Sequence, residues 1–190
     1  MTRRQQGFTL LELLMVLGIT TILLTLGVPA WQNLVERMQV GNWQRQLHGA
    51  LNYTRAHAIH SGIPTTMCAR GNGGGCAADG GNWHRGWLVF EDGAGHRDCQ
   101  PNDAGSRCQH SGARILRVNR GPEELRIVNN HNIARRVHYN PMGLSYGYTG
   151  RFTVCARHKD VADKGLVIAN TGRIRGTHAD ELLDCPRKDA

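Results

Sequence analysis

Polar and basic residues open the chain, and a long apolar run follows them. Residues 1–6 are polar and include two arginines, whereas residues 8–30 contain one charged side chain, Glu12. As a helix rising about 1.5 Å per residue, this run would span roughly 35 Å, more than the bilayer core of about 30 Å. The pattern predicts a single membrane-spanning helix over residues 8–30. The basic residues before it predict a cytoplasmic N-terminus in the inner membrane and an exported remainder.

Helical periodicity continues beyond the apolar run. Apolar residues recur at helical spacing among polar ones, at Leu34, Met38, Leu47, Leu51 and Ala58. Ser61 and Gly62, with Pro64 shortly after them, indicate where the helix ends. We therefore expect one helix over about residues 8–60, in which residues 31–62 form an amphipathic continuation that packs against the rest of the chain.

From residue 63 the helical period disappears, and short apolar runs alternate with clusters of Gly, Asn and Asp. The strand-like runs are Thr65–Ala69, Gly86–Phe90, Ile115–Val118, Leu125–Val128, Val137–Tyr139, Phe152–Ala156 and Gly165–Ala169. Residues 70–82 and 91–112 are rich in turn-forming residues and are expected to be loops. The sequence thus predicts an α+β chain in which a long helix carries a mostly antiparallel β head of residues 63–190.

Six cysteines lie in the head, at Cys68, Cys76, Cys99, Cys108, Cys155 and Cys185. Their spacing contains no C-x-x-C pair, which argues against a zinc site. Export to an oxidising compartment favours disulfides instead, and pairing each cysteine with its neighbour is the simplest of the many possible arrangements. That arrangement joins Cys68 to Cys76, Cys99 to Cys108 and Cys155 to Cys185.

Other candidate chemistry in the head is sparse. His57 and His60 lie about one helical turn apart, but no third ligand follows at matching spacing, so we predict no metal and no cofactor. The absence of paired carboxylates or a triad-like order argues against an enzyme. Trp83 and Trp87 offer either base stacking or core packing, and their place in an apolar run favours the core.

The start of the apolar run carries a motif. A carboxylate in lipid costs about 2.5 kcal/mol or more unless it is partnered, so Glu12 implies a partner. Residues 7–12, GFTLLE, resemble the type IV prepilin signature. The resemblance implies that a prepilin peptidase removes residues 1–7 by cutting after Gly7 and that the new N-terminus, Phe8, is methylated. It also implies that Glu12 neutralises the N-terminal amine of a neighbouring subunit; the alternative is a plain anchor with a chance glutamate.

The head extends the resemblance. Residues 50–59, ALNYTRAHAI, together with Trp83 and residues 86–92, GWLVFED, resemble the GspH/FimT group of minor pilins and pseudopilins. This resemblance implies two small β-sheets packed on the long helix, and a non-catalytic subunit near the tip of a filament in the periplasm or at the cell surface. Its expected partners are major and minor pilins.

Two arginines near the C-terminus follow a strand-turn-strand pattern. Residues 165–176 read as a strand, a tight turn and a second short strand. Because side chains alternate along a strand, Arg173 and Arg175 would project to one side, about 7 Å apart, while Ile174 points into the core. Paired guanidinium groups suit contacts with phosphates.

The same element, with Gly172 before the first arginine, resembles the G-R-x-R motif of FimT proteins from naturally competent bacteria. This resemblance implies non-specific binding of double-stranded DNA at a pilus tip during natural transformation. The net charge of +8 also favours an anionic partner. Further basic residues are candidates to widen the surface: Arg135, Arg136, Arg151, Arg157 and Lys159.

A competing interpretation assigns these arginines a structural role. Arginine pairs commonly form surface ion pairs, and Asp180 and Glu181 lie close by in the sequence. In that case the chain would be a structural tip subunit of a pilus, or a pseudopilin of a type II secretion filament, without DNA binding. An enzyme displayed at the surface is the third, least supported class.

Overall fold

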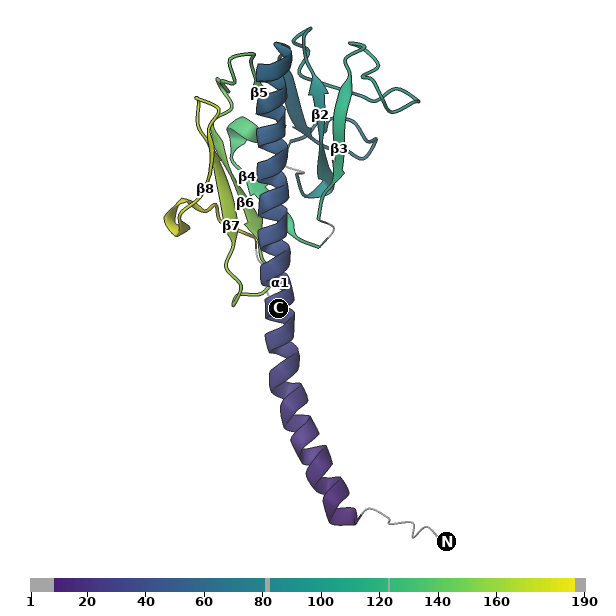
Figure 1. Ribbon diagram of the computed structural model, residues 1–190, viewed down its shortest axis with the longest axis vertical. Helices are drawn as coiled ribbons and strands as arrows, with labels where there is room; N and C mark the ends of the chain where they lie inside the picture. Colours follow the sequence, from purple (N-terminus) through teal and green to yellow (C-terminus); the bar gives the residue numbers. More distant parts are fainter. Residues whose placement is uncertain (1–8, 81–82, 123, 187–190) are drawn as a thin grey trace.

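The computed structural model describes residues 9–80, 83–122 and 124–186, and it consists of one long helix with a two-sheet head on its C-terminal half (Figure 1). The helix, α1, runs from Leu10 to Ser61. At its start the Thr9 hydroxyl accepts a hydrogen bond from the Glu12 amide at 3.2 Å, and at its end Gly62 adopts a φ of 68°. The predicted C-terminus is confirmed, whereas Gly7 and Phe8 lie outside the described residues.

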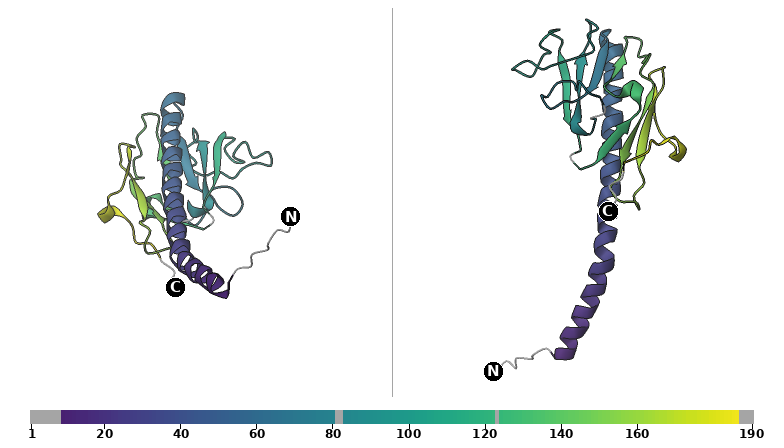
Figure 2. Two further views of the ribbon diagram at one scale, coloured as in Figure 1. Left: turned by 60° about the horizontal axis from the view of Figure 1, so that its bottom comes forward. Right: turned by 180° about the vertical axis from the view of Figure 1, so that it is seen from behind.

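The head covers α1 only over its C-terminal half, as the two views in Figure 2 show from other sides. Val40, Leu47 and Leu51 are fully buried beneath the head. Leu34 and Met38 are 49% and 55% exposed, so their predicted place in the packed stripe is wrong. The head does not extend far enough along the helix to cover them: the first buried residue of α1 is Glu36, and only isolated positions are covered before Val40.

The N-terminal half of α1 presents apolar side chains on all sides. Its large apolar residues between Leu10 and Leu26 are 55–78% exposed. Among the described residues, α1 is the helix that is long and apolar enough to cross a membrane by length and composition. Burial of such a surface in lipid or in a filament is the physical requirement that follows, since a helix that is apolar all round is normally buried.

Each of the two sheets in the head has four antiparallel strands. The first sheet has the order β3-β2-β1-β5, with β1 at Thr65–Ala69, β2 at Gly86–Glu91, β3 at Ile115–Arg120 and β5 at Arg136–Tyr139. The second sheet has the order β4-β6-β7-β8, with β4 at Arg126–Asn129, β6 at Gly150–Cys155, β7 at Lys164–Ile168 and β8 at Ile174–Gly176. Each strand-like run in the sequence coincides with one of these strands, so the predicted fold class is confirmed.

Tryptophans fill the core where the sheets and α1 meet. Trp83 is fully buried, packs edge-on against Phe152 with ring centroids 4.9 Å apart, and donates its indole N–H to the carbonyl of Ile133 at 3.0 Å. Trp87 is 1% exposed and packs edge-on against Trp43 of α1. Both rings therefore serve the core, as their apolar surroundings predicted, and neither is free to stack on a base.

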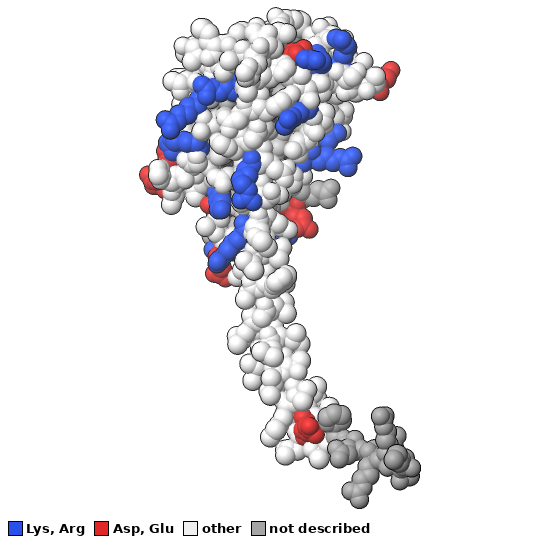
Figure 3. Space-filling view, in the orientation of Figure 1, with Lys and Arg blue, Asp and Glu red and all other residues white. Residues whose placement is uncertain are grey.

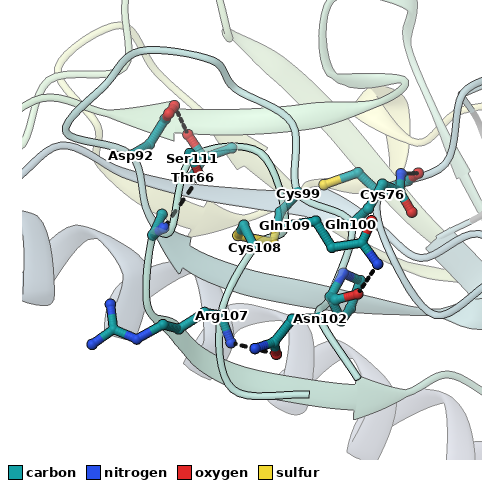
Figure 4. The surroundings of a disulfide bond; sticks show 12 residues. Thr66, Cys76, Asp92, Cys99, Gln100, Asn102, Arg107, Cys108, Gln109 and Ser111 are labelled. Carbon is teal, nitrogen blue, oxygen red and sulfur yellow. Dashed lines mark hydrogen bonds between the residues drawn. A yellow bond between two sulfur atoms is a disulfide. The ribbon is translucent and has the colours of Figure 1, made fainter. Parts of the chain in front are cut away.

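Disulfides fasten the two long loops and the C-terminal tail. The pairs are Cys68–Cys76, Cys99–Cys108 and Cys155–Cys185, the neighbouring pairs favoured from the sequence. Figure 4 shows the second of these bonds with Gln100, whose side chain donates to the carbonyl of Cys76 at 3.1 Å and so links the two loops. The loops thus form one cross-linked unit beside the first sheet.

Candidate nucleic-acid interface

The β7–β8 hairpin presents the two candidate arginines on a tight turn. The Gly172 amide donates to the carbonyl of Ala169 at 2.8 Å, and the Ala169 amide donates to the carbonyl of Arg173 at 3.0 Å. Gly172 has a φ of 73°, and a Cβ there would overlap the carbonyl oxygen of Gly143. Glycine is therefore required both by the backbone conformation and by the close approach of the neighbouring loop.

Arg55 of α1 fixes this turn to the helix. Its Nε donates to the carbonyl of Gly143 at 3.0 Å, and its Nη2 donates to the carbonyl of Thr171 at 3.2 Å. One guanidinium thus joins the helix to two loops, and it holds the residues that precede Arg173 in place. Arg55 was not singled out from the sequence, because its partners lie 88 and 116 residues away.

Arg173 and Arg175 are both exposed, whereas Ile174 between them is partly buried, which is the alternation that the strand pattern predicts. Arg175 makes a two-pronged ion pair with Glu181, with Nη1 donating to Oε2 at 2.6 Å and Nη2 donating to Oε1. In the described part of the chain, the Arg173 side chain has no hydrogen bond or ion pair. One of the two arginines is thus neutralised and the other is available.

The ion pair changes the titration of both partners. Hydrogen bonds from Arg175, and then from the His178 amide, lower the pKa of Glu181 to about 2. The same contact raises the pKa of Arg175. Glu181 therefore remains a carboxylate throughout the neutral and mildly acidic range, and it competes with any phosphate for Arg175.

The C-terminal tail holds Glu181 over the outer face of the second sheet, the face turned away from α1. Arg151, Val167 and Arg175 stand in register across β6, β7 and β8. Arg151 donates to the backbone carbonyl of Glu181 at 3.2 Å, and the Leu183 amide donates to the Thr153 hydroxyl at 3.0 Å. The Cys155–Cys185 disulfide then closes the tail onto β6.

The remaining basic candidates are not brought together with Arg173. Arg135 and Arg136 belong to the edge of the first sheet, where Arg136 donates to the carbonyl of Arg97 and burial lowers the pKa of its guanidinium. Arg157 forms an ion pair with Glu124 at 3.2 Å. Lys159 is exposed in the loop between β6 and β7.

His57, one of the two histidines spaced by a helical turn, is held in a polar network. His57 lies 2.9 Å from Glu91, which also binds Arg114 at 2.7 Å, so a polar network occupies that position. Within the described residues, no three His, Cys, Asp or Glu side chains cluster closely enough to hold a metal ion.

Two protein-family models match this chain. The family model described as type II transport protein GspH matches residues 44–172, which include the C-terminal part of α1, the strands from β1 to β7 and the turn before Arg173. The chain belongs to the GspH family. A second model, the prokaryotic N-terminal methylation motif, matches residues 2–28.

Individual proteins share part of this sequence or this fold. A fimbrial protein of Moraxella nonliquefaciens is 33% identical over 76 residues, a match that spans 40% of this chain and 41% of that protein. Two crystal structures of the type IV minor pilin FimU from Pseudomonas aeruginosa share the fold at 18% identity, with TM-scores of 0.54 and 0.51. They cover 77% and 74% of this chain and 94% of each FimU chain. This GspH-family chain therefore has the fold of the type IV minor pilin FimU.

Proposed function

We propose that this chain is a minor type IV pilin that binds double-stranded DNA without sequence preference, through the arginine-bearing β7–β8 turn, for uptake in natural transformation. Prepilin peptidase would first remove residues 1–7, and the apolar part of α1 would hold the subunit in the inner membrane. The subunit would then join a filament with major and minor pilins, with Glu12 partnering a neighbouring N-terminal amine.

The DNA proposal rests mainly on the exposed and unpaired side chain of Arg173. It is exposed, it has no partner among the described residues, and the turn that precedes it is fixed by Arg55 and Gly172. A rigid base keeps the entropy cost of binding low, because only the arginine side chain must be ordered. Guanidinium groups are suited to phosphate oxygens, and such contacts carry little sequence preference.

A structural role is the second candidate, and the Arg175–Glu181 ion pair favours it. Both oxygens of Glu181 are used, and the carboxylate also accepts the His178 amide at 3.0 Å. An arginine satisfied in this way would stabilise the tail rather than recruit a ligand. The chain would then be a tip subunit of a pilus or of a type II secretion filament without DNA binding.

Measuring DNA binding by the purified mature chain in a non-ionic detergent distinguishes the two functions. The wild type is expected to bind a short duplex with a dissociation constant on the order of 10⁻⁴ to 10⁻⁶ M, with affinity falling as salt rises. Arg173→Gln should weaken binding. Arg120→Gln, which removes another exposed charge, from β3, is the matched control and should bind as the wild type does. Equal binding by all three proteins would refute DNA binding through Arg173 and favour the structural role.

A further inference from the structure

Two cations converge over a glycine of α1, at the start of β7 and away from the arginine-bearing turn. Gly41 is buried, and a Cβ at that position would lie 3.3 Å from Lys164 Nζ and 3.4 Å from Arg45 Nη1. The two nitrogens therefore lie close to each other, since each is within 3.4 Å of the same point. Lys164 opens β7 and stands 119 residues after Arg45, so the pairing is a product of the fold.

Among the described residues, these two cations make no direct ion pair. Neither Arg45 nor Lys164 forms a hydrogen bond or an ion pair with a described acidic side chain. A hollow of about 630 Å³ lies beside them, and its lining includes Arg37 but no Asp or Glu. Arg37 is directed by a hydrogen bond to the backbone carbonyl of Asp160 at 3.2 Å. Like charges held this close repel one another, so the arrangement favours an anion between them.

The position of this pair is fixed by the packing of α1 on β7. Gln44, next to Arg45, donates its side-chain amide to the carbonyl of Gly165, next to Lys164, at 2.9 Å. Gly176, which follows Arg175 in β8, lies within reach of the same Gln44 amide, at 3.9 Å from an added Cβ. Gln44 thus fixes the start of β7 to α1 and lies beside the end of β8.

We propose that Arg45 and Lys164, with Arg37 beside them, form a second phosphate-binding subsite for the DNA that contacts Arg173; this inference rests on the proposed DNA binding. Figure 3 shows Lys and Arg side chains spread over this face of the head, with Asp and Glu side chains among them. Arg55, which holds the turn, stands ten residues after Arg45, or about 15 Å along the helix. At about 3.4 Å of axis per phosphate on each strand, that distance corresponds to roughly four base-pair steps.

The chemistry of the subsite fits a phosphodiester. Arg45 supplies a forked donor and Lys164 a compact point charge, and both act on phosphate oxygens without reading bases. The small side of Gly41 leaves the two groups room above the helix. A membrane phosphate is a poorer fit because Arg45 stands fifteen residues beyond Ala30, about 22 Å along the helix. The headgroup layer on each side of a bilayer is only about 5–8 Å thick.

The test compares Arg45→Gln/Lys164→Gln with Arg120→Gln/Arg126→Gln, a control that removes two exposed charges elsewhere on the head. Mature full-length proteins in non-ionic detergent are titrated with a labelled 30-bp duplex over a series of salt concentrations. The subsite variant should bind about tenfold more weakly at low salt, and the slope of log affinity against log salt should fall by about 0.9 for each lost contact. The control pair should keep the wild-type slope. Arg45→Lys/Lys164→Arg, which preserves both charges, should restore binding, and unchanged thermal unfolding shows that the fold is intact.

Three outcomes separate this inference from the function on which it rests. Wild-type binding by the subsite variant, with Arg173→Gln weakened, overturns the subsite and leaves the proposed function standing. Wild-type binding by both variants overturns the two together. If the subsite variant instead loses binding to vesicles containing phosphatidylglycerol while its DNA affinity is unchanged, the site takes a lipid phosphate and the DNA subsite is refuted.

Discussion

Glu181 binds Arg175 through both carboxylate oxygens, and so it occupies the guanidinium fork that a phosphate would use. If Arg175 contributes to DNA binding, Glu181→Gln should raise the affinity by a few-fold, because the carboxylate no longer competes. Asp180→Asn is the matched control, since it changes the net charge equally and breaks no direct ion pair among the described residues. Anisotropy titration of both variants at one salt concentration provides the measurement. An equal gain for both would show that only net charge matters.

The Arg175–Glu181 ion pair should stabilise the folded state over a defined pH range. Because the pKa of Glu181 is lowered to about 2, below the ordinary value of about 4.3, its ionised form stabilises the folded state at and above that ordinary value. The contribution is lost as the pH falls toward 2. Competition by Glu181 should therefore persist at every pH at which the head is used.

Gly172 gives a test of the turn beneath Arg173. Gly172→Ala should destabilise the head by about 1–3 kcal/mol and weaken DNA binding, because the backbone has a positive φ and an added methyl group meets Gly143. Gly147→Ala is the control: its φ is 78°, but nothing lies within 4 Å of the added carbon. Chemical denaturation of both proteins separates the cost of the φ angle from the cost of the overlap. Equal destabilisation would refute the close approach.

The Cys155–Cys185 bond should hold Glu181 over the second sheet. Its loop of 30 residues corresponds to roughly 3–4 kcal/mol of chain-entropy stabilisation. Cys155→Ser/Cys185→Ser should lower stability by up to that amount and free Arg175 from the tail. Cys99→Ser/Cys108→Ser, which opens a loop of 9 residues beside the first sheet, should lower stability less, by roughly 2.6 kcal/mol, and leave DNA binding unchanged. Denaturation midpoints and duplex titrations of both variants test this, and loss of DNA affinity in the first would contradict it.

Much of the fold could be predicted because its signals are local. The helix follows from an apolar run joined to a 3.6-residue period, and Gly62 marks its end through its left-handed conformation. Strands follow from short apolar runs between turn residues. Leu34 and Met38 were misplaced because periodicity identifies an apolar face but not how far the head extends along it.

The site could be predicted only in part, because most of its contacts join distant segments. Alternation along β8 placed Arg173 and Arg175 on one side, and the nearness of Glu181 in sequence raised the possibility of an ion pair. The clamp by Arg55 and the meeting of Arg45 with Lys164 depend on how α1 packs against the second sheet. No pattern within either segment encodes those distances.

The lowered pKa of His138 should make the stability of the head depend on pH. Burial lowers its pKa, a shift that Asp92 opposes and Arg97 reinforces. The unfolded chain then binds a proton more readily than the folded chain, so stability should fall as the pH drops below about 6.5. His138→Asn keeps a donor near the Thr66 hydroxyl, which lies 2.8 Å from Nδ1, and should reduce this dependence. Thermal unfolding at pH 7.5 and 5.0 provides the test, and the loss of stability between the two pH values should be smaller in the variant. His84, whose pKa is lowered by burial and by Arg85 and Arg126, should account for part of the remaining slope, so an unchanged slope in the variant would exclude His138 as a source.

The last prediction distinguishes the role of Gly7 in leader removal from the role of Glu12 in filament assembly. Gly7→Leu should block removal of residues 1–7 by prepilin peptidase, because a bulky residue would not fit where the resembling motif has glycine, and mass spectrometry should find the full-length chain. Glu12→Gln should be processed normally and remain in the membrane, since removing a charge from an apolar helix lowers the cost of insertion. It should nevertheless be depleted from sheared filaments, because the amide cannot neutralise a neighbouring amine. Thr20→Val, a neutral change farther along the same apolar segment, is the control and should reach filaments as the wild type does. Normal incorporation of Glu12→Gln would show that the carboxylate has no partner in the filament, and the chance-glutamate interpretation would then hold.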